Sequence, residues 1–173
     1  MQAEKREIRI SDAIVMEMDQ EAEATRRLFN VIPEDKLAWR PHAKARSLGE
    51  LAMHIATLPG DLAGIAELDS HEAGDFPGDP EATSRGQILE VFEESLKRGK
   101  EIVGATDDAG ATADWTLTKD GAALMTMPRM GFWRMAMLNH NYHHRGQLST
   151  YLRELDVELP SIYGPSADTN PFG

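Results

Sequence analysis

Two histidines spaced four residues apart are the part of this sequence best suited to chemistry. They are His140 and His144, and on a helix this spacing places both side chains on one face, about 6 Å apart along the axis. Both imidazoles can then bind one divalent metal ion at about 2.0–2.1 Å. The pair is therefore a candidate metal-binding motif.

The neighbours of this pair place it inside the protein. Met137 and Leu148 continue the same helical stripe, so both histidines are expected to point into the core. His54 lies between Leu51 and Leu58 on the apolar side of another predicted helix. Burying an imidazole costs free energy unless its nitrogens find partners, and a metal ion is one such partner. The alternative is that the buried histidines form hydrogen bonds with one another or with water.

The composition narrows the type of site. The 173 residues include no cysteine, which excludes disulfides, iron–sulfur clusters, thiolate zinc sites and cysteine nucleophiles. Three histidine ligands leave coordination positions open, as catalytic zinc sites do, and such a site can activate water or a thiol. Asn141 follows His140 where the H-E-x-x-H metalloproteases carry their glutamate base. Because an amide cannot act as a base, this slightly favours the thiol.

Other polar residues nearby are candidates for a supporting role. A metal-bound histidine usually donates its second N–H to a polar group. The candidates for orienting the ligands or contacting a substrate are Asn139, Asn141, Arg145, Gln147 and Asp61. For Arg145, an ion pair with a carboxylate of another helix is favoured over binding an acidic group of a substrate.

The remaining three histidines are not expected to be ligands. His143 lies about 100° round the helix from its neighbour His144. His42 and His71 fall in predicted loops, where surface roles are expected.

The charge of the chain limits its partners. The net charge is −11, from 18 basic and 29 acidic residues. A nucleic-acid binder normally carries a basic surplus or stripe, so direct DNA binding is disfavoured, as is binding to anionic membranes. The apolar runs are too short to span a bilayer, and residues 1–10 do not read as a signal peptide. A cytoplasmic location is the resulting expectation.

Four amphipathic segments must position the histidines. They are predicted at residues 11–30, 47–65, 80–106 and 129–155. Ser11 and Asp12 can cap the first, while Ser47 and Glu50 form a capping-box pattern at the start of the second. Pro59 lies inside the second pattern and predicts a kink there.

The connections complete the predicted architecture. Residues 32–46 and 70–80 are predicted loops, the first with a short turn at 34–38, and the tail from Val157 is predicted to be largely non-helical. Asp120-Gly121 between short apolar alternations favours a β-hairpin over residues 114–127, with a plain loop as the alternative. Together these segments predict an all-α four-helix bundle, with that hairpin before the last helix, forming a single domain over residues 1–173.

The segment from Leu138 to Leu148, LNHNYHHRGQL, strongly resembles the closing helix of the DinB-like (damage-inducible, YfiT-like) metal-dependent proteins. Residues 32–39 (IPEDKLAW), 47–54 (SLGELAMH) and 163–166 (YGPS) also resemble that family, so the resemblance spans nearly the whole chain. It implies an up-down-down-up four-helix bundle, often a homodimer. It also implies one divalent metal ion, zinc or nickel, held at the positions of His54, His140 and His144.

The activity implied by the resemblance is broader. Some relatives are described as hydrolases, and others resemble transferases that use a low-molecular-weight thiol such as bacillithiol or mycothiol. An enzyme acting on a small-molecule substrate through a thiol or water is therefore the first expectation. A non-catalytic, metal-stabilised dimeric binding module is the alternative, and a DNA-repair role has only the family's name in its favour.

Overall fold

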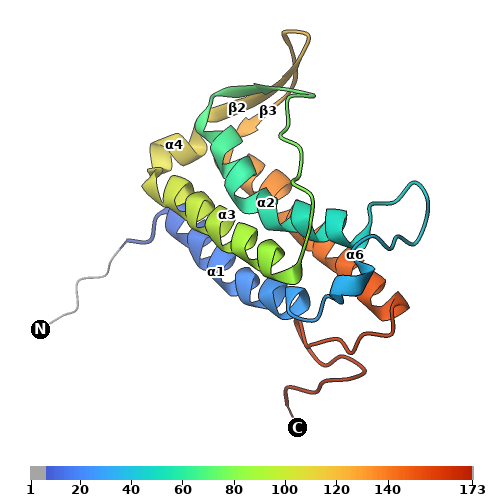
Figure 1. Ribbon diagram of the computed structural model, residues 1–173. Helices are drawn as coiled ribbons and strands as arrows, with labels where there is room; N and C mark the ends of the chain where they lie inside the picture. Colours follow the sequence, from blue (N-terminus) through green and yellow to red (C-terminus); the bar gives the residue numbers. More distant parts are fainter. Residues whose placement is uncertain (1–6, 173) are drawn as a thin grey trace, which may run out of the picture.

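The computed structural model describes residues 7–172 of the chain. Its main helices are α1 (Ile10–Phe29), α2 (Leu48–Glu67), α3 (Arg85–Ala105) and α6 (His140–Glu154). In Figure 1, α2 and α3 run in the same direction, whereas α1 and α6 run the opposite way. The predicted up-down-down-up bundle of four main helices is confirmed.

Seven shorter elements join these helices. They are η1 (Glu34–Lys36), β1 (Ser70–Glu72), α4 (Asp108–Thr112), β2 (Asp114–Lys119), β3 (Ala122–Pro128), α5 (Arg129–Phe132) and η2 (Trp133–Asn139). Among the helices of residues 7–172, none is both long and apolar enough to cross a lipid bilayer.

The predicted hairpin is present and belongs to a small sheet. Strands β2 and β3 are antiparallel, and the turn residues Asp120 and Gly121 have φ angles of 51° and 76°, as a two-residue primed turn requires. The prediction of a loop throughout 70–80 is wrong for β1, which pairs parallel with β2. Glu72 fixes this pairing, because its carboxylate accepts hydrogen bonds from Thr118 Oγ1 (2.6 Å) and the Asp120 amide (2.5 Å).

The helix starts agree only partly with the prediction. At α2, Ser47 Oγ accepts from the Glu50 amide (3.1 Å) and Glu50 accepts from the Ser47 amide (2.7 Å), so the capping box is confirmed. At α1 the N-cap is Arg9, whose amide donates to Asp12 (3.2 Å). Ser11 lies inside the helix and is buried, so its prediction as a cap is wrong.

The region predicted as one helix over 129–155 consists of three consecutive segments. Between α5 and α6, η2 has the π-helical register, whose i→i+5 hydrogen bonds widen the turn and shift the following residues round the axis. The buried residues of α6 are Asn141, His144, Arg145, Leu148 and Leu152. His140 lies at the margin of this face and is partly buried, so the face is rotated slightly from the predicted stripe.

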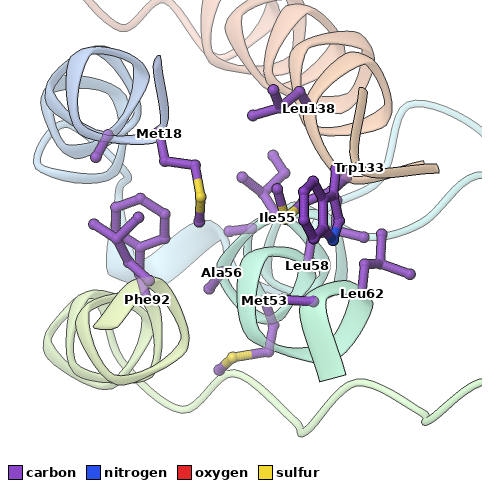
Figure 2. Close-up of a cluster of buried hydrophobic side chains, with 14 of the residues drawn as sticks. Met18, Met53, Ile55, Ala56, Leu58, Leu62, Phe92, Trp133 and Leu138 are labelled. Atoms are coloured by element: carbon purple, nitrogen blue, oxygen red, sulfur yellow. The ribbon is translucent and has the colours of Figure 1, made fainter. Parts of the chain in front are cut away.

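Helix α2 forms the centre of the core. In Figure 2, Met18 from α1 and Phe92 from α3 lie on one side of the α2 side chains, and Trp133 from η2 lies on the other. Helices α2 and α3 approach closely, because a Cβ at Gly99 would lie 2.6 Å from the carbonyl oxygen of Pro59. Side chains on α2 are therefore held in place by packing from both sides.

Pro59 leaves a backbone carbonyl without its helical partner. A proline at this position has no N–H to donate to the carbonyl of Ile55, four residues earlier. Asn141 of α6 replaces that donor, with its Nδ2 lying 3.2 Å from the Ile55 oxygen. This bond joins α2 and α6 next to the histidines, because His54 directly precedes Ile55 and His140 directly precedes Asn141 in the sequence.

Candidate metal centre

The three histidines predicted as ligands meet between α2 and α6. One ligand nitrogen from each of His54, His140 and His144 can be chosen so that all three lie within 4.8 Å of one another. The Nε2 atoms of His140 and His144 are 2.8 Å apart, and the His54 ring centroid lies 4.7 Å from that of His144. The structure therefore brings these side chains together, while their binding of a metal ion stays a prediction.

Two outer hydrogen bonds set the orientation of the rings. His54 Nδ1 lies 3.0 Å from Oδ2 of Asp79, and His144 Nδ1 lies 2.8 Å from Oε1 of Gln147. Both partner atoms are oxygens that accept, so each Nδ1 donates and each Nε2 is left for the cluster. There the Nε2 atoms of His144 and His140 lie at hydrogen-bond distance from one another. Histidine ligands of metals are usually held by outer hydrogen bonds of this kind.

The burial of the cluster favours neutral imidazoles. Burial lowers the pKa of His140, and the nearby His54 lowers it further. Burial also lowers the pKa of His144 to about 4, and neighbouring histidines act in the same direction although Gln147 opposes them. At neutral pH both rings are thus in the deprotonated form that binds metals.

The geometry of the cluster fits a divalent metal ion. His54 Nε2 is buried and has no hydrogen-bond partner among residues 7–172, although buried polar atoms are almost always paired. A metal ion shared with the other two rings would satisfy this atom. Imidazole nitrogens suit zinc, nickel, copper and iron, so the donor set agrees with the zinc or nickel expected from the sequence.

Asp79 is the supporting residue that the sequence did not indicate. It lies in the connection between β1 and α3, and it also accepts a hydrogen bond from Thr57 Oγ1 (3.1 Å). Burial alone would raise the pKa of Asp79, but the contacts with His54 and Thr57 lower it below its ordinary value. The surrounding residues are rich in glycine, proline and aspartate, and without periodicity nothing marks one of them as a partner for His54.

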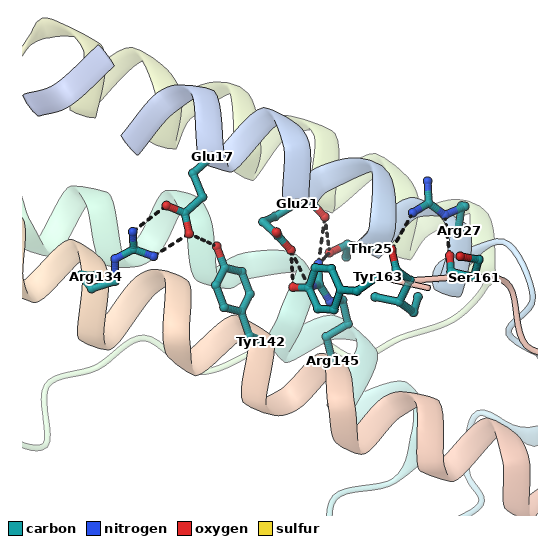
Figure 3. Close-up of polar contacts among 10 residues, drawn as sticks. Glu17, Glu21, Thr25, Arg27, Arg134, Tyr142, Arg145, Ser161 and Tyr163 are labelled. Carbon is teal, nitrogen blue, oxygen red and sulfur yellow. Dashed lines mark hydrogen bonds and ion pairs between the residues drawn. The ribbon is translucent and has the colours of Figure 1, made fainter. Parts of the chain in front are cut away.

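The residues predicted to support the site have different locations. Gln147 lies at the cluster, and Asp61 lines a neighbouring cavity. Asn141 is bonded to the Ile55 carbonyl, and Asn139 is exposed. The side chain of Arg145, only 3% exposed, pairs with Glu21 of α1 (Figure 3), which agrees with the structural interpretation favoured for it.

The other three histidines lie outside the cluster of ligand atoms. His143 and His42 are exposed, and His42 Nδ1 accepts from the Lys44 amide at 3.1 Å. His71 lies on β1 and not in a loop, with its ring 4.8 Å from that of Phe76 and its Nε2 buried. The surface role expected for His71 therefore does not describe its position.

A cavity of about 280 Å³ adjoins the histidine cluster. His54 and His140 form part of its wall, together with Asp61 and Asp79. The rest of the wall is largely apolar and comes from α2, the connection between β1 and α3, the β2–β3 hairpin, α5 and η2. A small molecule in this cavity would lie next to the three imidazoles.

Comparison with known proteins shows a match to a protein family. The sequence profile of the DinB family matches residues 4–170. The uncharacterized protein YrdA of Bacillus subtilis is 26% identical over 153 residues, which cover 86% of this chain and 84% of that protein.

Solved structures agree with the helical arrangement. A DinB-like protein from Bacillus cereus superposes with a TM-score of 0.69 at 21% identity, covering 88% of this chain and 97% of that one. The DinB-like protein YjoA from Bacillus subtilis gives a TM-score of 0.66 at 20% identity, covering 87% and 96%. At these identities the likeness establishes the fold alone.

Proposed function

This chain belongs to the DinB family, and from that premise we propose that it is a metal-dependent enzyme acting on a small molecule. In this proposal His54, His140 and His144 hold one divalent ion, zinc or nickel, and the open side of the site faces the adjoining cavity. The observation that carries the proposal is the convergence of the three imidazoles, with ligand nitrogens within 4.8 Å of one another.

Each residue of the site has a distinct role in this proposal. A divalent ion bound there would supply Lewis acidity that favours the deprotonated form of a thiol or water. Asp79 and Gln147 hold the rings of His54 and His144, with the Nε2 lone pairs directed away from these partners. The apolar wall of the cavity limits the access of bulk water to the reacting groups.

A thiol is the nucleophile that we place first. Asp79, the carboxylate nearest the cluster, is already engaged by His54 and Thr57 and is poorly placed to take a proton. A thiol needs no dedicated base, because binding to a metal favours the thiolate. The proposed reaction is therefore an S-transfer that uses a low-molecular-weight thiol.

Hydrolysis is the second candidate, and it has one observation in its favour. Asp61 lines the same cavity, and burial raises its pKa above the ordinary value, although the charge of Arg98 opposes this. A carboxylate with a raised pKa in a cleft is a candidate general base for a water nucleophile.

A metal-stabilised dimeric module without catalysis is the remaining alternative. Under this hypothesis a chelator lowers the melting temperature, but neither thiols nor small substrates raise it. Light scattering of the purified protein tests the homodimer, which stays a proposal.

Elemental analysis and metal titration test the metal site directly. We expect one zinc or nickel ion per chain in the native protein and the loss of stoichiometric binding in His144→Ala. His143→Ala is the matched control, since this neighbouring side chain is exposed. A native protein without metal, or a His144→Ala variant that retains it, contradicts the proposal.

A thiol-binding experiment separates the candidate activities. Calorimetric titration of the metal-loaded protein with bacillithiol or mycothiol should give binding that is absent in His144→Ala. Ester or amide hydrolysis without thiol binding would favour the water nucleophile. Activity that persists after loss of His144 would overturn both catalytic proposals.

A further inference from the structure

The cavity beside the histidine cluster has one apolar side and one acidic side. Its apolar wall is formed by side chains that include Leu58, Leu62, Trp115, Leu117, Met125 and Phe132. Its polar groups include His54, Thr57 and Asp61, which follow one another at intervals of three and four residues along one face of α2. A bound molecule would therefore contact a polar row on α2 and apolar residues of α2, the hairpin and α5.

The charge of the cavity wall is negative. The described residues that line it include Asp61 and Asp79 but no lysine or arginine. Arg98 and Arg46 each approach one of these carboxylates at 3.8 Å, but both arginines are outside the lining, with side chains 60% and 43% exposed. Exposed pairs of this kind are weak, so Asp61 keeps a carboxylate facing the cavity. Asp61 lies seven residues beyond His54, about 10 Å along α2, so an anionic group at that end of the cavity would meet Asp61 away from the proposed metal ion.

The size of the cavity limits the ligand to a small molecule. Its volume of about 280 Å³ lies near the lower end of the range for ligand pockets, about 300–1,000 Å³. That space can hold a compact ring system with one short polar substituent. On the side formed by β2, the buried ring of Trp115 packs against that of Phe132, with centroids 3.9 Å apart, and supports the apolar wall.

We propose that this cavity binds the apolar part of a small substrate and discriminates against carboxylate, sulfonate or phosphate groups on the part of the substrate that lies beside Asp61. The inference rests on the proposed function, because it places the reactive end of the substrate beside His54 and His140. It adds the class of substrate, a small hydrophobic electrophile or ester without an anionic group at the end beside Asp61.

Three naphthalene probes of equal ring size test the charge preference. Naphthalenemethanol is neutral, (naphthylmethyl)trimethylammonium is cationic and naphthalenesulfonate is anionic, and none of them is a strong metal ligand. Calorimetric titration of the protein with and without metal should show binding of the first two probes. The metal-free protein, in which no bound cation can attract the sulfonate, should bind the sulfonate at least tenfold more weakly. Equal or tighter binding of the sulfonate by the metal-free protein overturns the proposal.

Variants of the wall locate the binding. Met125→Trp should fill the cavity from β3 and weaken binding of the neutral probe at least tenfold, whereas Leu124→Trp on the exposed side of the same strand should leave it unchanged. Asp61→Asn should strengthen sulfonate binding and weaken trimethylammonium binding. Unchanged probe affinities in both Met125→Trp and Asp61→Asn overturn the proposal.

Metal content, measured in every sample, separates this inference from the proposed function. A protein that holds its metal but binds none of the three probes overturns the inference and leaves the metal site intact. A protein that binds no metal but retains the neutral probe with the expected charge preference overturns the proposed function and supports the ligand class.

Discussion

Asp79 holds the ring of His54, and its removal should weaken metal binding without unfolding the protein. The carboxylate accepts a hydrogen bond from His54 Nδ1 at 3.0 Å. Loss of such an outer partner typically lowers metal affinity about 10–100-fold. We expect Asp79→Ala to show a decrease of that order in a zinc competition titration, and Asp79→Asn to be intermediate because its amide oxygen still accepts.

The control for this prediction lies in the same connection. Asp75 is exposed, and its amide, not its side chain, bonds to the Glu72 carbonyl. Asp75→Ala should keep the affinity of the wild type. Equal affinities for Asp79→Ala and Asp75→Ala would show that the contact with His54 has no effect on binding.

Asn141 and Pro59 form a pair whose energetic coupling can be measured. Asn141 donates a hydrogen bond to the Ile55 carbonyl, to which Pro59 cannot donate because it has no backbone N–H. Asn141→Ala leaves that buried oxygen unpaired and should lower the free energy of unfolding by about 1–3 kcal/mol. In a Pro59→Ala background the new N–H can bond to Ile55, so the same substitution should cost clearly less.

Urea denaturation of the four proteins in this double-mutant cycle gives the coupling. Asn139→Ala is the control on the neighbouring exposed position and should change stability by less than about 0.5 kcal/mol. If Asn141→Ala costs the same with Pro59 and with Ala at that position, the asparagine does not replace the missing helical donor.

The histidines could be predicted from the sequence, whereas their partners could not. His54, His140 and His144 lie in apolar helical patterns, so periodicity alone indicates that they face the interior. Asp79 reaches His54 only through the path of a loop, and the bond from Asn141 depends on how two helices pack. Such contacts are tertiary and leave no local pattern.

At the scale of the helices, a row of polar contacts sets how η2 and α6 lie against α1 (Figure 3). Glu17 of α1 accepts from Arg134 (2.5 Å) and from the Tyr142 hydroxyl (2.8 Å). One turn further along α1, Glu21 pairs with Arg145. Because His144 is adjacent to Arg145, these contacts also fix the rotation of α6 that turns His144 toward α2.

The two ion pairs of this row should differ in their effect on stability. The side chains of Arg145 and Glu21 are 3% and 13% exposed, so Arg145→Met leaves a largely buried carboxylate that keeps a hydrogen bond from the Tyr163 hydroxyl (2.6 Å) but has lost its cation. We expect a loss of about 3–5 kcal/mol in unfolding free energy. Arg134→Met breaks a pair that is 48% and 28% exposed and should cost less than about 1 kcal/mol. Similar losses in urea denaturation would contradict this ranking.

Glu17 should make the stability depend on pH in the acidic range. The hydrogen bond from Arg134 lowers the pKa of Glu17 below its ordinary value, although burial opposes it and Tyr142 assists. A group with a lower pKa in the folded state stabilises the protein above its unfolded pKa, about 4.3, and loses that effect as the pH falls through the folded pKa.

The Glu17→Gln variant isolates this contribution. The difference in unfolding free energy between wild type and Glu17→Gln should be constant near neutral pH and should shrink on acidification below about pH 4. A difference that grows as the pH falls would have the wrong sign for a carboxylate with a lowered pKa.

Elements with a strong local pattern were predictable, and those made by tertiary contacts were not. The four helices and the Asp120-Gly121 hairpin follow from periodicity and turn chemistry. Strand β1 is held by tertiary contacts, namely its backbone pairing with β2 and the bonds of Glu72 to the facing strand and its turn. The π-helical register of η2 and the short α4 also lack a distinct sequence pattern. The orientation of α6 about its own axis, which follows from η2, could therefore not be predicted from the sequence.

On the scale of the whole molecule, the histidine cluster joins parts of the chain that are far apart in sequence. His54 belongs to α2, His140 and His144 belong to α6, and Asp79 adds the long connection that returns the chain to the start of α3. The cavity lies in the same region and is closed partly by the hairpin. The up-down-down-up order requires that long connection, since α2 and α3 run in the same direction (Figure 1). The topology thus provides both the outer partner of His54 and part of the cavity wall.

Metal removal should therefore lower the stability of the whole protein and not only affect the site. A ligand at 1,000 times its dissociation constant stabilises the folded state by about 4.1 kcal/mol. For a chain of this size, about 1 kcal/mol shifts the melting temperature by roughly 2–4 °C, so a strong chelator should lower it by about 8–16 °C. Hydrogen exchange should increase most in α6 near His140 and in the connection around Asp79, because the metal would hold these segments against α2.

The His144→Ala variant should have a lower melting temperature even before the chelator is added and should respond little to it, whereas His143→Ala should behave as the wild type. A chelator effect of equal size in His144→Ala and the wild type would place the stabilising ion elsewhere in the molecule.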